Sequence, residues 1–140
     1  IYGPFANAHF GASVSLSGNG GQLAIGSPGS DGGVSVWGLN QGDWIQDGLT
    51  IEANKLLLSV GKISLSADGN IVAMSGIPLS GGSAVVQIYH LVLGDWEPLG
   101  SSIKGQFQNT SYFCDLSGNG QVVAVSNYYV GSAGRAEGAL

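Results

Sequence analysis

The stretch FGASVSLSGNGGQLAIGSP at residues 10–28 decides the fold, because the chain repeats its pattern twice more. Residues 60–75 read VGKISLSADGNIVAMS, and residues 112–126 read YFCDLSGNGQVVAVS. The turn glycines Gly20, Gly69 and Gly120 are spaced by 49 and 51 residues. Self-similarity at such a period is the sequence signature of a repeat architecture.

Each copy of the pattern predicts a β-hairpin. Bulky Val14 and Leu16 alternate with Ser15, which is the two-residue period of a strand. Asn19-Gly20 follows, and the other copies carry Asp-Gly or Asn-Gly there. These dipeptides tolerate positive φ and predict a type I′ turn into a second strand. One face of each hairpin is bulky and the other carries Ala, Gly or Ser. Neither face is charged, so we expect both to be buried.

The repeat extends over four strands. Gly-Asp-Trp occurs at residues 42–44 and again at 94–96, which adds an outer hairpin to each of the first two units. Four short antiparallel strands per ~50 residues are the plan of a β-propeller blade. The strands are expected at residues 12–17, 22–27, 34–39, 44–51, 62–66, 71–75, 84–91, 96–103, 112–116, 121–127 and 136–140.

The predicted fold class is therefore all-β, a single repeat array of about 2.7 propeller blades that forms an incomplete propeller. Residues 1–9 are expected to hold the end of a preceding blade and a connector. The blades are then expected at residues 10–53 and 60–105, with a partial third blade at 111–140.

Several phrases of the first unit resemble the FG-GAP-type repeat, which builds propellers of the integrin α-subunit kind and of many bacterial and algal extracellular proteins. They are Phe10-Gly11, Ala-Ile-Gly-Ser-Pro at residues 24–28 and Gly-Val-Ser-Val-Trp at residues 33–37. The resemblance covers nearly the whole chain. It is clearest in the first unit and weakest in the third, where Ser126-Asn127-Tyr128 replaces the GAP element. It implies an extracellular or cell-surface (secreted) propeller.

Many FG-GAP blades carry a calcium loop, but this chain departs from that pattern. Ca²⁺ takes six to eight oxygen ligands. The candidate loops here hold Asp31 alone or Asp68 alone. We therefore expect no metal and no cofactor, and interpret both residues as turn formers.

Charge and composition exclude further classes of function. Only 9% of the residues are charged, the net charge is −5, and the four cations do not cluster. A nucleic-acid surface needs clustered Lys and Arg, so no nucleic-acid partner is expected. No run approaches the ~20 apolar residues of a transmembrane segment. The single cysteine, Cys114, takes the place of Val14 and Ile63 in the repeat, which predicts a small buried hydrophobe.

An enzyme is not expected. The two histidines, His9 and His90, occupy non-equivalent positions, and no Cys/His pattern has the spacing of metal ligands. The chain has no G-x-S-x-G nucleophile elbow. Most of the nine acidic residues fall in or beside predicted turns.

The candidate contact residues lie in loops that are expected at one end of the blades, at residues 28–33, 77–83 and 128–135. Asp31 lies in the first loop. Tyr128 and Tyr129 lie in the third and have no counterpart in the other units, so they suit either a ligand contact or a packed loop. Asn109 begins an Asn-Thr-Ser glycosylation sequon, which fits a secretory setting. By contrast, the recurring pairs Trp44/Trp96 and Trp37/Tyr89 predict packing between blades.

Known propellers close with about four to eight blades, and this chain holds fewer. The missing blades are expected on further sequence of the same protein; alternatively, two copies of the chain close a six-bladed ring. The leading functional hypothesis is a non-enzymatic adhesion or binding module for protein or glycan. The alternatives are a structural accessory or fibre-forming subunit without a small-molecule ligand, and a hydrolase domain carried on a propeller.

Overall fold

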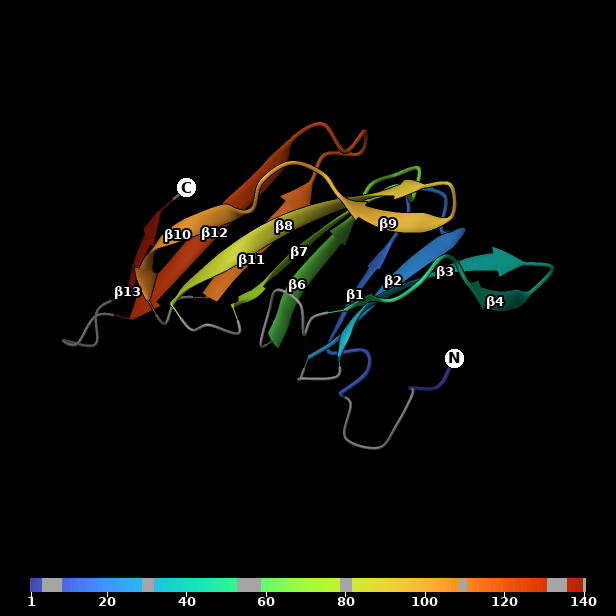
Figure 1. Cartoon of the computed structure of the whole chain (residues 1–140), viewed down its shortest axis with the longest axis horizontal. Helices are drawn as coiled ribbons and strands as arrows, with labels where there is room; N and C mark the ends of the chain where they lie inside the picture. Colours follow the sequence, from blue (N-terminus) through green and yellow to red (C-terminus); the bar gives the residue numbers. More distant parts are fainter. Residues whose placement is uncertain are drawn as a thin grey trace.

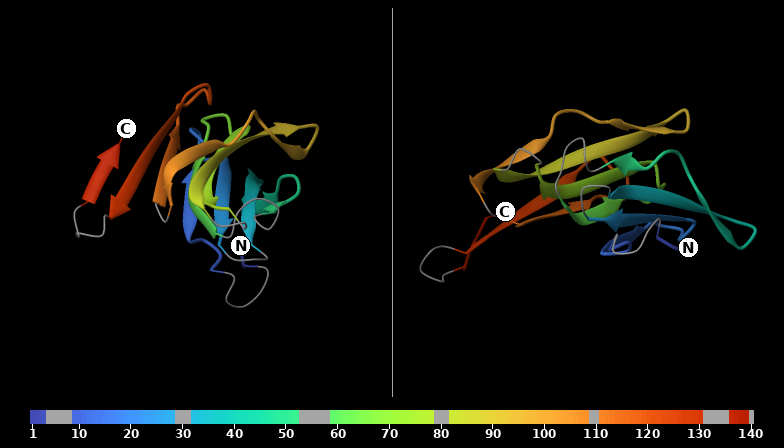
Figure 2. Two further views of the ribbon diagram at one scale, coloured as in Figure 1. Left: turned by 60° about the vertical axis from the view of Figure 1, so that its left-hand side comes forward. Right: turned by 60° about the horizontal axis from the view of Figure 1, so that its bottom comes forward.

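The computed structural model describes residues 1–3, 9–28, 32–52, 59–78, 82–108, 111–130 and 136–139, and within these ranges it contains strands and no helix. Three antiparallel sheets lie side by side in the order of the chain, with the N-terminus near the first sheet and the C-terminus at the third (Figures 1 and 2). Each sheet holds one copy of the repeated hairpin, so the predicted all-β, propeller-like class is confirmed.

The first two sheets share one topology. In both, successive strands pair antiparallel, and a fifth strand pairs with the third one. The first sheet contains β1 (Ser13–Leu16), β2 (Gln22–Ser27), β3 (Gly33–Asn40), β4 (Asp43–Gln46) and β5 (Ile51–Glu52). The second contains β6 (Ser59–Leu65), β7 (Ile71–Ile77), β8 (Ser83–Val92), β9 (Asp95–Pro98) and β10 (Ile103–Gln108). The third contains β11 (Ser111–Leu116), β12 (Val123–Val130) and β13 (Ala136–Ala139).

The predicted fourth strand of the first two units is broken, which corrects the prediction of continuous strands at residues 44–51 and 96–103. Gly48 and Gly100 interrupt these segments with φ values of 73° and 72°. A strand needs negative φ, and glycine enters the left-handed region at little steric cost. The chain therefore pairs with the third strand twice, first through β4 or β9 and then through β5 or β10.

The hairpin turns also differ from the prediction, since Asn19 does not take the positive φ that a type I′ turn requires. The carbonyl of Ser17 accepts a hydrogen bond from the N–H of Gly20, which places Gly18 and Asn19 at the centre of the turn. The Asn19 Oδ1 then accepts from the Gly21 N–H at 2.8 Å and from the Ser17 hydroxyl at 2.9 Å.

The same side-chain bonds recur at Asp68 and at Asn119 in the other two copies. Because the side-chain acceptor holds the turn, only the glycine that follows it is left-handed. Two-residue turns with positive φ at both positions do occur, but in the outer hairpins, at Gln41-Gly42 and at Leu93-Gly94.

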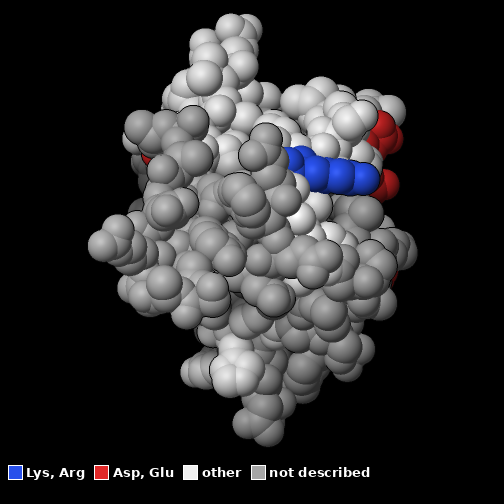
Figure 3. Space-filling view, turned by 90° about the vertical axis from the view of Figure 1, so that its left-hand side faces the viewer, with Lys and Arg blue, Asp and Glu red and all other residues white. Residues whose placement is uncertain are grey.

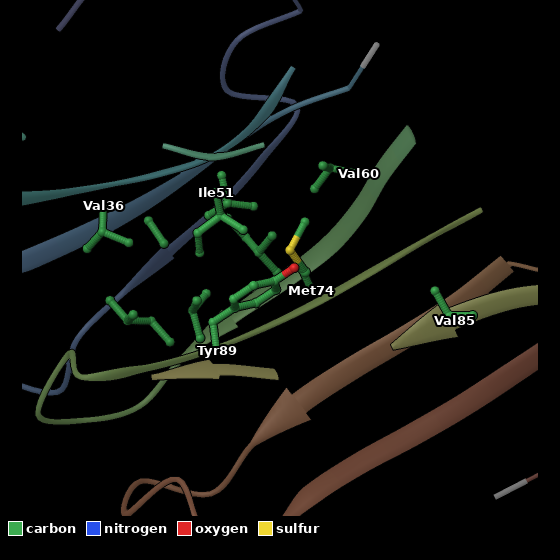
Figure 4. Packing of buried hydrophobic residues seen from close by; sticks show 11 residues of the cluster. Val36, Ile51, Val60, Met74, Val85 and Tyr89 are labelled. Carbon is green, nitrogen blue, oxygen red and sulfur yellow. The ribbon is translucent and has the colours of Figure 1, made fainter. Parts of the chain in front are cut away.

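Each sheet has a bulky face and a small-residue face, and the core forms where the two kinds of face meet. The small face of the first sheet, with Ala24 and Val36, covers the bulky face of the second, with Ile63 and Met74. Figure 4 shows Val36 and Ile51 directed toward Met74 and Tyr89. Fully burying one such side chain contributes about 1.5–3 kcal/mol.

A second cluster repeats this arrangement one sheet further along. Ala73, Ala84 and Val86 of the second sheet pack against Tyr112 and Cys114 of the third. The prediction that both faces are buried is thus confirmed for the second sheet. It is wrong for the β1 part of the bulky face of the first sheet, where Val14 and Leu16 are exposed.

Candidate functional site

A groove of about 790 Å³ lies between the outer strands of the first two sheets. The first sheet contributes β4, β5 and the residues between them, and the second contributes β8 and β9, at the same end of the molecule in Figure 1. The groove is lined by Gln46, Leu49, Thr50, Ile51, Glu52, Tyr89, Asp95, Trp96 and Pro98.

Two aromatic residues of the second sheet form one wall of the groove. Tyr89 on β8 is buried, and its burial raises the pKa of the phenol, so the hydroxyl keeps its proton at neutral pH. Trp96 on β9 reaches across the groove, where its Nε1–H donates to the Asp47 carbonyl at 3.3 Å. A Cβ at Gly48 would lie 3.2 Å from the Trp96 ring. The glycine therefore lets the indole lie against the backbone of the first sheet.

Polar groups of the lining come from both sheets. The Gln46 side-chain amide donates to the Thr50 hydroxyl at 3.1 Å and to the Gly48 carbonyl at 3.3 Å, which holds the segment between β4 and β5 in place. The carboxylates of Glu52 and Asp95 are exposed. None of the nine lining residues is a Lys, Arg or His. An apolar wall with a few polar groups at its edges is the usual composition of a small-molecule site.

A smaller hollow of about 220 Å³ lies over the bulky face of the first sheet. It is lined in part by Trp37, which occupies the place that Tyr89 has in the second unit, and by Gln46, which occupies the place of Pro98. The Trp37 Nε1–H donates to the Ser35 hydroxyl at 2.8 Å. The repeat thus places an aromatic side chain beside a hollow in both of the first two units.

The candidate residues predicted from the sequence are not brought together in the part of the chain that is described. Asp31 and Asn109 lie outside the described residues. Tyr128 and Tyr129 were expected in a loop, but they continue the strand β12, where they pair with Gly138 and Glu137 of β13. That loop prediction is wrong, because the strand extends three residues past its predicted end at Asn127.

The groove itself was missed by the sequence reasoning. Its signal was the recurrence of Trp37/Tyr89 and Trp44/Trp96, which we interpreted as packing between blades. For Tyr89 and Trp96 that interpretation is confirmed, since Tyr89 belongs to the first core cluster and Trp96 packs against it. The same side chains also line the groove.

Acidic and metal-ligating groups do not gather in the described ranges. No set of three or more His, Cys, Asp or Glu side chains there could hold a metal ion. At the end of the molecule that carries the third sheet, Figure 3 shows one blue region with red groups beside it, and no extended basic patch among the described residues. In the same described ranges no helix is long and apolar enough to cross a membrane.

Cys114 is buried in the second core cluster, as predicted. Its thiol donates a long hydrogen bond of 3.6 Å to the Lys62 carbonyl. Burial, together with the neighbouring charge of Asp115, raises the pKa of the thiol to about 11. The thiolate is the reactive form, so this side chain acts as a packing residue at neutral pH.

No family model and no curated protein matches the chain. Two solved structures are similar to it in part. TolB from Acinetobacter baumannii aligns with a TM-score of 0.47 and 12% identity, over 89% of this chain and 31% of its own. AofleA from Arthrobotrys oligospora aligns with a TM-score of 0.49 and 10% identity, over 96% of this chain and 42% of its own. The chain spans less than half the length of either protein, and the propeller-like description rests on its own strand pairing.

Proposed function

We propose that this chain is a non-enzymatic, extracellular propeller segment of the FG-GAP type, and that the groove between its first two sheets binds an uncharged glycan. The observation that carries the proposal is the lining of the groove. Trp96 and the largely buried Tyr89 form an aromatic wall, polar groups stand at its edge, and none of the nine described residues that line the groove is a Lys, Arg or His.

Sugars match this lining chemically. The C–H groups on one face of a pyranose ring pack against an aromatic ring, and its hydroxyls pair with carboxylates and amides. Glu52, Asp95 and Gln46 supply acceptors and donors of this kind. The two carboxylates disfavour acidic sugars, because like charges repel. The expected ligand is therefore a neutral oligosaccharide.

The family and the location rest on sequence features. The phrases at residues 10–11, 24–28 and 33–37 support an FG-GAP-type repeat, and the sequon at Asn109 supports passage through a secretory route and a glycoprotein. Asp31, Tyr128 and Tyr129 remain candidates for a contact with a protein ligand.

The test is binding of the chain to an array of neutral and sialylated oligosaccharides, followed by calorimetry with the best neutral ligand. Asp95→Ala is expected to weaken binding at least about tenfold, the loss of one charge-assisted hydrogen bond. Asp43→Ala is the matched control, because Asp43 has the same place in the first unit and does not line the groove. Absence of binding to every neutral glycan, or an equal loss in both variants, would contradict the proposal.

A structural role is the second candidate function. The observation that favours it is the exposure of Val14 and Leu16, since equivalent residues of the other sheets are covered by a neighbouring sheet. A surface of this kind in an accessory subunit is covered by another protein in an assembly.

A further inference from the structure

The bulky face of the first sheet is open along β1, although Ile25 on β2 of the same face is only 4% exposed. The first strands of the other two sheets are covered on the equivalent face. Val14 is 53% exposed, whereas Ile63 in the same place of the second sheet is 1% exposed. Leu16 is 58% exposed, whereas its counterpart Leu65 is 6% exposed. In the second and third sheets the cover is the small-residue face of the preceding sheet. The structure therefore contains two examples of what covers this kind of face.

The small-residue face of the third sheet is exposed at Ala124, and it is the kind of face that covers a bulky face elsewhere in the chain. Ala24 and Ala73 are fully buried by the bulky face of the following sheet. Ala124 has the same place in the third sheet and is exposed. The chain thus carries, on two different sheets, the two halves of an interface that it forms twice internally.

The two internal interfaces share one polar contact: a side chain on the first strand of one sheet accepts a hydrogen bond from a backbone N–H on the first strand of the next sheet. Ser15 accepts a hydrogen bond from the N–H of Leu65, and Ser64 accepts one from the N–H of Leu116, both at 3.0 Å. Asp115 has this place in the third sheet. Its Oδ1 accepts from the Ser64 hydroxyl at 2.8 Å, and a carboxylate has further acceptor positions.

The first sheet has backbone N–H groups that are placed to donate this same contact. Backbone N–H groups alternate in direction along an antiparallel pair. Because the Ser17 N–H donates to Gln22 of the partner strand, the N–H groups of Val14 and Leu16 point away from β2. In the second sheet the equivalent N–H groups, those of Ile63 and Leu65, bond to the preceding sheet.

We propose that two copies of this chain associate head to tail, with the small-residue face of one copy's third sheet covering the bulky face of the partner's first sheet. The Asp115 carboxylate accepts the N–H of the partner's Leu16. Each copy supplies one half of each of two identical interfaces, which is compatible with twofold symmetry. This proposal does not depend on the glycan groove.

Sedimentation equilibrium of the 140-residue chain tests the association. The expected mass is twice the chain mass of 14.1 kDa. Leu16→Glu blocks one half of the interface and Ala124→Glu the other, so each variant alone is expected to be a monomer. Leu93→Glu is the control, a fully exposed leucine on the turn between β8 and β9. Near-ultraviolet circular dichroism checks that each variant is folded.

Mixing the two blocked variants is the decisive measurement. A mixture of Leu16→Glu and Ala124→Glu contains one intact interface and is expected to form a one-to-one dimer, which association through two identical surfaces could not produce. A monomeric wild-type chain at every concentration, open-ended polymers, or a mixture that stays monomeric would overturn the proposal. A dimer lost equally in Leu93→Glu would do the same.

Discussion

The hydroxyl of Ser15 accepts a hydrogen bond from the backbone N–H of Leu65 at 3.0 Å, and this bond joins the first strand of one sheet to the first strand of the next. The first strand is an edge strand, so one side of its backbone has no neighbouring strand in its own sheet. The serines of the preceding sheet supply the missing acceptors. The hairpin turns of neighbouring sheets are also hydrogen-bonded to each other. The Gly18 N–H donates to the Ala67 carbonyl, and the Ala67 N–H donates to the Gly118 carbonyl.

Ser64→Ala is expected to destabilise the chain by about 1–3 kcal/mol, because it removes a buried hydroxyl and leaves the partly buried N–H of Leu116 without its acceptor. The substitution also removes the bond to Asp115. Urea unfolding measures the effect, and Ser101→Ala is the control because Ser101 is exposed. A loss below about 0.5 kcal/mol, the range of ordinary surface substitutions, would mean that water replaces the serine hydroxyl.

Replacing the strand-breaking glycines by alanine separates backbone strain from packing. Gly48 and Gly100 have nearly the same positive φ, but a Cβ at Gly48 would lie 2.6 Å from the Gly94 carbonyl oxygen, whereas one at Gly100 meets nothing within 4 Å. Gly100→Ala is expected to cost about 1–2 kcal/mol from the left-handed conformation alone. Gly48→Ala is expected to cost measurably more, because the second sheet must also move. Equal losses in thermal unfolding would show that the two sheets are not held at this distance in solution.

The alternation of bulky and small residues predicted the repeated hairpins correctly, because successive side chains of a strand point to opposite faces of the sheet. The bulky positions of Val14 and Leu16 and their counterparts share one face in every sheet. The turn type was predicted wrongly, because the propensity of Asn-Gly for positive φ competes with a side-chain bond. Here the Asn19 Oδ1 finds the Gly21 N–H and the Ser17 hydroxyl, and the alternative conformation is more favourable.

The groove could not be predicted from single positions. Tyr89 and Trp96 line it only because Gly48, far away in the sequence, lets the outer edge of the first sheet approach the indole. Such a surface depends on how far two neighbouring sheets separate, and neither the periodicity nor the composition of one unit encodes that separation.

Leu93→Asn is expected to stabilise the chain by about 0.5 kcal/mol. Leu93 is fully exposed and has φ of 51°, at the first position of a two-residue turn in which asparagine is much better tolerated. Leu49→Asn is the control, an exposed leucine without positive φ, and is expected to give no gain. A rise in the thermal midpoint measures the effect. An equal rise in both variants would attribute the gain to lower surface hydrophobicity instead of turn geometry.

The stability of the chain is expected to fall between pH 9 and pH 11 through Cys114. The ordinary pKa of the thiol is 9.0, and burial, aided by the charge of Asp115, raises it to about 11 in the folded chain. Below pH 9 the thiol is protonated in both states and its contribution is fully present. Above pH 9 the unfolded chain loses the proton first, which favours unfolding by up to about 2–3 kcal/mol as the folded pKa is reached.

Cys114→Val removes this contribution, because it introduces the side chain that Val14 has in the same place of the first unit, and valine does not titrate. Tyr89, whose pKa is also raised by burial, is present in both proteins and cancels in the comparison. The free energy of unfolding is measured in urea at several pH values. Between pH 9 and pH 11 that of the wild type should fall relative to that of the variant. A difference that is constant from pH 8 to pH 11 would show that the thiol reaches solvent in the folded chain.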